Sequence, residues 1–259
     1  MPEHSPVRRV LVVEHQESCP PALVGQWLED EGVELEVVRP YRGEPVPDRL
    51  EVDGLLVLGG SMGATDDERA PWLPATRDLI RSAATEDAPV LGVCLGHQLA
   101  AVALGGEVAR NPKGQTVGAR AVTRQDGTDP LAAALPAGSH VAQWNDDIVV
   151  TAPPGTLTLA TNDRDDLLMA RFAASVWGIQ GHPEATAEIV GVWAANDQAE
   201  GGLTGATPQQ VPAILDDLER RQPEISAAWG PVVAAWAGLL SRRWRRARWR
   251  SPPLPHPGR

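Results

Sequence analysis

One segment of the chain has the residues and spacing of a nucleophile turn. In Gly92-Val93-Cys94-Leu95-Gly96 an apolar run passes through Gly-x-Cys-x-Gly into a segment of helical character. The flanking glycines permit a sharp strand-to-helix turn that exposes the central side chain. A thiol there lies at a helix N-terminus, whose partial positive charge stabilises the reactive thiolate. Cys94 is therefore a candidate nucleophile, although a small buried hydrophobe fits this pattern alone equally well.

A second segment supplies a base and an acid. His182 and Glu184 stand two residues apart, directly after the apolar run 176–180. In an extended backbone residues i and i+2 point the same way, so the Glu184 carboxylate can orient the His182 imidazole. A thiol, an imidazole and an orienting carboxylate form a complete set for acyl transfer.

The elements that must position these residues alternate between short apolar runs and segments of helical period. Such alternation predicts an α/β fold with a doubly wound, mostly parallel sheet and helices on both faces. Expected strands are 9–13, 33–38, 54–58 and 89–93, with helices at 21–31, 72–84 and from Cys94 to about 104. Short strands at 117–122, 139–144, 148–151, 157–160, 168–172 and 176–180 suggest antiparallel additions and a last strand that returns to the core. Expected C-terminal helices are 187–195, 212–221 and a last one through Trp229 and Trp236.

The two segments together resemble a known family. Val-Cys-Leu-Gly-His-Gln, followed 88 residues later by Gly-His-Pro-Glu, resembles class I (triad) glutamine amidotransferases, above all the stand-alone GMP synthase-like members. Gly-Ile-Gln-Gly-His-Pro-Glu is also similar to the γ-glutamyl peptidase branch. The resemblance runs from about residue 8 to 240 and implies a flavodoxin-like fold. It implies a Cys94–His182–Glu184 triad that cleaves the γ-carboxamide of glutamine, or a γ-glutamyl bond, through a thioester hydrolysed by water.

The resemblance also assigns residues around the triad. It implies that the backbone N–H groups of Gly60 and Leu95 form the oxyanion hole. The glycine-rich turn 59–63 follows an expected strand and lets backbone approach a substrate closely, which suits that role. Gln98, Ser61 and Asp147 are the implied substrate-binding residues. Gln98 follows Cys94 by four residues and therefore falls on the same helix face as the candidate nucleophile.

Three positions depart from the family pattern. Asn145 and Asp146 stand where stand-alone relatives commonly have His and Gly, and Leu168 stands where they often have Gln. We expect all three on the substrate side of the site, with the Asp146 side chain narrowing the pocket and adding negative charge. Two other residues carry no expected role: His97 points into packing, and Cys19 lies in a loop outside the chemistry.

Charge and composition exclude other classes of partner and cofactor. The chain has 34 acidic and 23 basic residues, and seven of its arginines lie in the last 19 positions, so the body is strongly acidic and repels nucleic acid. Two cysteines form no disulfide framework, and no leader pattern opens the chain, which predicts a cytoplasmic protein. No metal-ligand spacing, Walker loop or Gly-x-Gly-x-x-Gly occurs, so we expect no metal and no cofactor.

The expected domain covers residues 1–240, with a helical extension from about 198 and a basic, Pro-rich, partly disordered tail over 241–259. The longest uncharged run, 225–241, falls just short of a membrane span. Three functions stay open. The first is a glutamine-dependent enzyme that releases ammonia to a partner synthetase, because the chain has no ATP-binding motif. The second is a free-standing γ-glutamyl hydrolase. The third, a non-catalytic regulatory or binding relative, is disfavoured because Cys94, His182 and Glu184 are all present.

Overall fold

A twisted nine-stranded sheet forms the centre of the computed structural model, which describes residues 7–125 and 127–240. Its strand order is β2-β1-β3-β4-β11-β10-β9-β6-β7. The parallel half contains β1 (Arg8–Val13), β2 (Val33–Val38), β3 (Gly54–Val57), β4 (Val90–Val93) and β11 (Val176–Ile179). The antiparallel half contains β6 (Thr116–Arg124), β7 (His140–Asn145), β9 (Leu157–Asn162) and β10 (Leu167–Ala173). The expected α/β sheet with a parallel core and antiparallel additions is confirmed.

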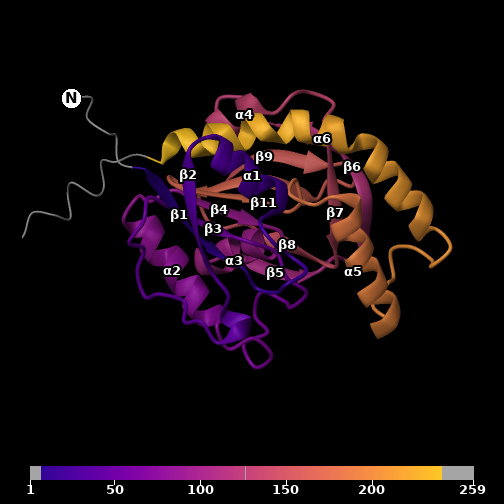
Figure 1. Cartoon of the computed structure of the whole chain (residues 1–259), viewed down its shortest axis with the longest axis horizontal. Coiled ribbons are helices and arrows are strands. Elements are labelled where there is room, and N and C mark those ends of the chain that lie inside the picture. The colour runs from indigo at the N-terminus through magenta and orange to yellow at the C-terminus, as the bar shows by residue number, and fades with distance from the viewer. Residues whose placement is uncertain (1–6, 126, 241–259) are drawn as a thin grey trace, which may run out of the picture.

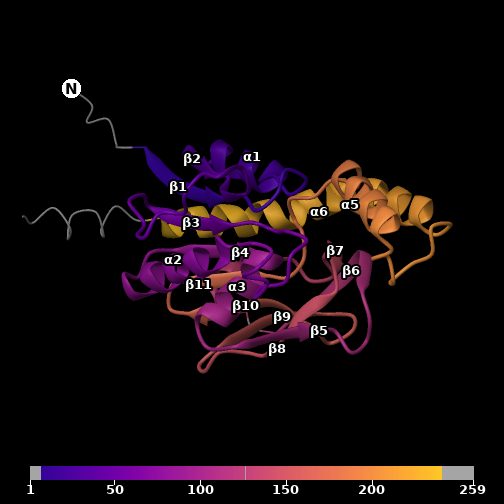
Figure 2. The same ribbon diagram turned by 90° about the horizontal axis from the view of Figure 1, so that it is seen from below.

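Helices cover both faces of this sheet (Figure 1). On one face lie α1 (Ala22–Asp30), α4 (Pro130–Ala134) and α6 (Val211–Leu239), and on the other lie α2 (Leu73–Thr85) and α3 (Leu95–Ala103). A separate ribbon of β5 (Glu107–Arg110) and β8 (Asp147–Thr151) lies beside α3 (Figure 2). A short 3-10 turn, η1, spans Pro40–Arg42, and α5 covers Ala187–Glu200. The parallel strands are almost wholly apolar because helices bury both of their sides.

The C-terminal helices differ from expectation. In place of two helices around 212–221 and Trp229, a single helix of 29 residues, α6, runs through Pro223 and Pro231. Its buried residues Leu218, Trp229 and Trp236 keep one apolar stripe against the sheet across both prolines. Burial of that stripe outweighs the lost backbone hydrogen bonds. The strand β5 and the helix α4 were not expected at all.

Three other expectations concern the helical extension, the tail and a possible membrane span. The proposed start of a helical extension at about 198 stays a prediction. The helix α5 runs through this position to Glu200. The tail 241–259 lies outside the described residues. Within the described part of the chain, no helix combines the length and apolarity needed to cross a bilayer.

Candidate active site

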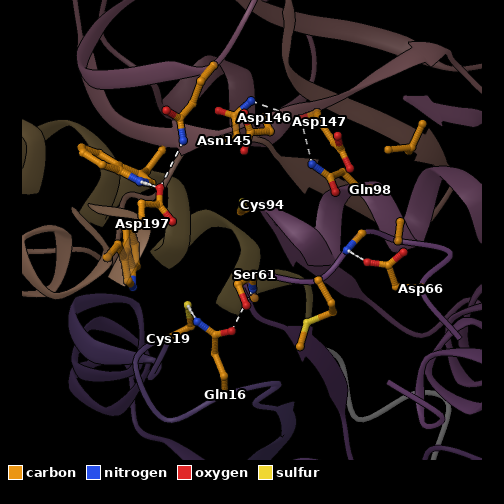
Figure 3. Close-up of a pocket in the computed structure, with 18 of the residues that line it drawn as sticks. Gln16, Cys19, Ser61, Asp66, Cys94, Gln98, Asn145, Asp146, Asp147 and Asp197 are labelled. Atoms are coloured by element: carbon orange, nitrogen blue, oxygen red, sulfur yellow. Dashed lines mark hydrogen bonds between the residues drawn. The ribbon is translucent and has the colours of Figure 1, made fainter. Parts of the chain in front are cut away.

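Four strand ends meet at one edge of the parallel half. The strands β1, β3, β4 and β11 are neighbours and run in the same direction, so the residues after their carboxyl ends lie side by side. Ligand sites of open α/β sheets form at this edge. Here it brings together Gln16, Gly60, Cys94 and His182, which all line one cavity of about 430 Å³. Figure 3 shows Gln16 and Cys94 in this cavity.

Cys94 occupies the turn between β4 and α3 with φ of +50°, a left-handed conformation that is rare outside glycine. The turn needs its flanking glycines. A Cβ on Gly92 would lie 2.3 Å from the Gly96 carbonyl oxygen, and one on Gly96 would lie 2.0 Å from the Val57 oxygen. The Cys94 N–H donates to the Ile179 carbonyl at 2.8 Å, which fastens the turn to β11. Two strands and a helix therefore determine the direction of the thiol.

The expectation of an exposed thiol is wrong. Cys94 is only 6% exposed and belongs to the apolar core, although its side chain borders the cavity. The backbone after β3 passes close to it, since a Cβ added at Gly59 would lie 3.7 Å from the Cys94 Cβ. The thiol lies at the floor of a pocket and not on an open surface.

His182 and Glu184 are joined as the spacing predicts. The His182 Nδ1 lies 2.7 Å from the Glu184 Oε1, and both side chains are buried. The backbone N–H of His182 donates to the Ala142 carbonyl of β7 at 2.7 Å, so an isolated antiparallel bridge holds the backbone here. The imidazole also packs against the Trp193 ring of α5, with 4.4 Å between ring centroids. The ring is thus fixed on two sides.

The charges around His182 favour its protonated form. Burial lowers the pKa of this imidazole, but the charges of Cys94 and Glu184, with a hydrogen bond to each, outweigh burial and raise the pKa to about 10. An imidazolium paired with a thiolate is the reactive state of cysteine hydrolases. The neighbouring Cys19 behaves differently, because burial and the charges of Cys94 and Glu184 raise the pKa of its thiol far above the usual range.

This difference predicts which cysteine is alkylated. We expect iodoacetamide to modify Cys94 at pH 7 about tenfold faster or more in wild type than in His182→Ala, because a positively charged imidazole favours the reactive thiolate form of a neighbouring thiol. Peptide mass spectrometry reads both cysteines at once, and unmodified Cys19 is the internal control. Equal rates of Cys94 modification in the two proteins would contradict the pairing of His182 with Cys94.

The residues expected at the oxyanion hole are neighbours in space. A Cβ on Gly60 would lie 2.9 Å from the Leu95 Cδ2 and 2.6 Å from the Met62 Sδ, so a larger residue there would have to displace both side chains. Gly60 borders the cavity, whereas Leu95 is buried beside it. Their role stays a prediction.

Sequence reasoning missed the residue that holds this loop. Gln16 follows β1, accepts a hydrogen bond from the Ser61 N–H at 2.8 Å, and donates to the Cys19 Sγ at 3.4 Å. A polar residue just past the end of an apolar strand is the available signal, but the residue that it holds is 45 positions away in the chain. Cys19, expected outside the chemistry, also borders the cavity.

Each residue expected to bind substrate borders the cavity. Ser61, Gln98 and Asp147 all line it. The Gln98 Nε2 donates to the Asp147 carbonyl at 2.9 Å and lies 3.3 Å from the Gln180 Oε1, so the amide is held by the protein. Burial, opposed by the Arg110 charge, raises the pKa of the Asp147 carboxyl.

The three residues that depart from the family pattern do not all lie at the cavity. Asn145 and Asp146 line the cavity. Burial is the main cause that raises the pKa of Asp146, and the charges of Asp197 and Asp147 add to it, while Arg110 at 3.1 Å opposes them. Leu168 is fully buried in the apolar core and does not reach the cavity, so its expected place on the substrate side is wrong. Leu168 lies in β10, where successive side chains point to opposite faces of the sheet, and its side chain points into the apolar core.

His97 packs in the interior of the protein. His97 is fully buried and packs on Phe172 at 5.0 Å between ring centroids, as expected for a residue that points into packing. Across residues 7–125 and 127–240, no group of three or more His, Cys, Asp or Glu side chains is arranged to hold a metal ion.

Comparisons with known proteins show which family this chain resembles. A family profile described as "Glutamine amidotransferase class-I" matches residues 20–192. "Gamma-glutamyl peptidase 5" of Arabidopsis thaliana is 28% identical over 62% of this chain and 66% of its own. A glutamine-hydrolyzing GMP synthase subunit of Natronomonas pharaonis is 32% identical over 61% of this chain and 78% of its own. A crystal structure of a glutamine amidotransferase from Methylobacillus flagellatus superposes with a TM-score of 0.79 at 30% identity, over 91% of this chain and 96% of that one.

Proposed function

The chain belongs to the class-I glutamine amidotransferase family and is therefore an enzyme, and on that premise we propose that Cys94, His182 and Glu184 act as its catalytic triad. The observation that carries this proposal is the buried His182–Glu184 pair at 2.7 Å, in which Cys94 and Glu184 together raise the pKa of the imidazole. The reaction is hydrolysis of the γ-carboxamide of glutamine.

The proposed steps use each group once in each half-reaction. The Cys94 thiolate attacks the amide carbon, and the N–H groups of Gly60 and Leu95 receive the developing oxyanion. The His182 imidazolium gives its proton to the departing nitrogen, so ammonia leaves and a γ-glutamyl thioester remains. The neutral imidazole then takes a proton from water, which attacks the thioester and releases glutamate. Glu184 keeps the His182 Nδ1–H oriented and stabilises the imidazolium.

The ammonia acceptor is part of the same proposal. The Natronomonas relative is named as one subunit of a GMP synthase, and this chain contains no ATP-binding motif to activate an acceptor. We therefore propose that a separate synthetase consumes the ammonia. Gln98, Ser61 and Asp147 hold the amino-acid end of the glutamine in this scheme.

A second candidate is hydrolysis of γ-glutamyl conjugates. The Arabidopsis relative is named a γ-glutamyl peptidase. The observation in favour is that the cavity extends past His182 to α5, where Trp193, Asn196 and Asp197 line it, which leaves room beyond the amide nitrogen.

Rapid quench of the purified protein with glutamine tests the shared chemistry. Ammonia and glutamate should form in equal amounts, and mass spectrometry should find a γ-glutamyl adduct on the Cys94 peptide only. Comparison of kcat/KM for glutamine with that for γ-glutamyl conjugates, with and without a candidate synthetase, separates the two functions. Absence of an adduct with every γ-glutamyl compound would refute the triad.

A further inference from the structure

The cavity has two halves, one on each side of Cys94. Gln98 and Asp147 lie on one side and Asp197 lies on the other (Figure 3). The first half is the proposed place of the glutamyl amino-acid end. The second half is on the side of His182, because the imidazole packs on Trp193 and Asp197 follows Trp193 by one helical turn of α5. Since His182 protonates the departing nitrogen, the leaving amine faces this second half.

The second half presents a carboxylate that has no cationic partner among the described residues. The Asp197 Oδ2 accepts hydrogen bonds from the Trp144 Nε1 at 2.7 Å and the Gln115 Nε2 at 3.2 Å. These donors are neutral, so they orient the carboxylate without neutralising it. In residues 7–125 and 127–240, no Lys or Arg lies within ion-pair distance of Asp197; the cavity's Arg110 pairs with Asp146 instead.

Two carboxylates also act on each other here. The Asp197 charge contributes to the raised pKa of Asp146, after burial, so the two groups repel across the cavity wall. A positive charge placed between them would relieve that repulsion. The described residues offer no third ligand that would make this a metal site.

Aromatic walls flank the carboxylate. Trp144 and Trp193 border the cavity and are both nearly buried, and the Trp193 Nε1 is fixed by the Ser18 carbonyl at 2.7 Å. Indole rings attract cations and also cover methylene groups. A carboxylate that shares its cavity wall with two tryptophans is suited to an alkyl chain that ends in an ammonium group.

We propose that the preferred substrates are γ-glutamyl amides of diamines or polyamines, with the second ammonium group of the leaving amine bound by Asp197. This inference rests on the proposed function and assigns its leaving group. Cys94 attacks the amide carbon, the bond to the amine nitrogen breaks, and His182 gives that nitrogen its proton, so a free diamine departs. Asp197 takes no part in the bond changes and determines specificity. Glutamine, whose leaving group is ammonia, leaves this half unused.

A matched substrate series tests the proposal on the wild-type protein. Mono-γ-glutamyl-1,4-diaminobutane carries the ammonium group, γ-glutamyl-pentylamide replaces that group with a methyl, and γ-glutamyl-4-aminobutyrate reverses the charge. We expect kcat/KM to fall about 10- to 100-fold from the cationic to the neutral amide, and further for the anionic one. The derivatives of 1,3-diaminopropane and 1,5-diaminopentane cover the spacing.

The variant Asp197→Asn tests whether Asp197 causes the preference for the cationic amide. Its KM for the cationic amide should rise about tenfold or more, while kcat and the constants for the neutral amide change less than about threefold. Glu200→Gln, at the exposed end of the same helix and outside the cavity, is the matched control and should resemble wild type.

The outcomes separate this inference from the function on which it rests. Equal kcat/KM for the cationic and neutral amides in wild type, or an equal loss for both in Asp197→Asn, would overturn the inference and leave the triad intact. Failure of wild type to cleave any of these amides, and glutamine, would overturn the proposed function itself. The wild-type comparison decides even if Asp197→Asn does not fold.

Discussion

Cys94→Ala should lower kcat by about 10⁴-fold or more while the protein stays folded, because burial raises the pKa of the cavity's other thiol, Cys19, and keeps it in the unreactive protonated form. The variant removes one sulfur atom at a position that already has a left-handed φ, so alanine adds no new backbone strain. Its thermal unfolding temperature should stay close to that of wild type. Turnover of the best γ-glutamyl amide and a melting curve on the same sample measure both quantities.

Cys19→Ser is the control for this variant. Cys19 also borders the cavity and accepts a hydrogen bond from Gln16, which a serine hydroxyl can still accept. We expect it to keep activity within about threefold. If Cys94→Ala retains activity and Cys19→Ser loses it, the nucleophile has been assigned to the wrong cysteine.

Gly96→Ala should destabilise the fold by about 3 kcal/mol or more, because its new Cβ would lie 2.0 Å from the Val57 carbonyl oxygen. Backbone cannot yield as a flexible side chain does, so α3 has to move away from β3. The unfolding temperature should fall by about 6–12 °C. The displaced helix start also carries Cys94, so activity should fall with stability.

A second helical glycine provides the comparison. A Cβ on Gly191 of α5 would meet the Leu215 Cδ1 at 3.5 Å, an ordinary contact. Gly191→Ala should therefore be neutral or stabilise by up to about 1 kcal/mol, through helix propensity alone. Equal melting temperatures for the two variants would show that the close approach of α3 to β3 is not required.

Sequence reasoning succeeded where a local pattern determines the structure. Apolar runs predicted the parallel core, Gly-x-Cys-x-Gly predicted the turn at Cys94, and the spacing of two predicted the contact between His182 and Glu184. Each of these depends on residues close together in the chain.

The misses depend on contacts between distant segments. Gln16 acquires its place only through Ser61, and Asp197 only through Trp144 and Gln115. Asp197 lies on a helix that also carries many exposed polar residues, so nothing local marks it. The loop after β3 likewise passes close to Cys94, an approach that cannot be inferred from the residues around the thiol.

The position of β11 has a consequence for biosynthesis. This strand pairs with β4 on one side and β10 on the other, and its last residue accepts the hydrogen bond from the Cys94 backbone. A growing chain emerges from the ribosome N-terminus first, so Cys94 is made well before the strand that brings His182 to it. Until β11 inserts, Cys94 lacks both the proposed base and the hydrogen bond to Ile179 that fastens its turn. On the proposed mechanism, completion of the sheet is therefore the event that makes Cys94 a nucleophile.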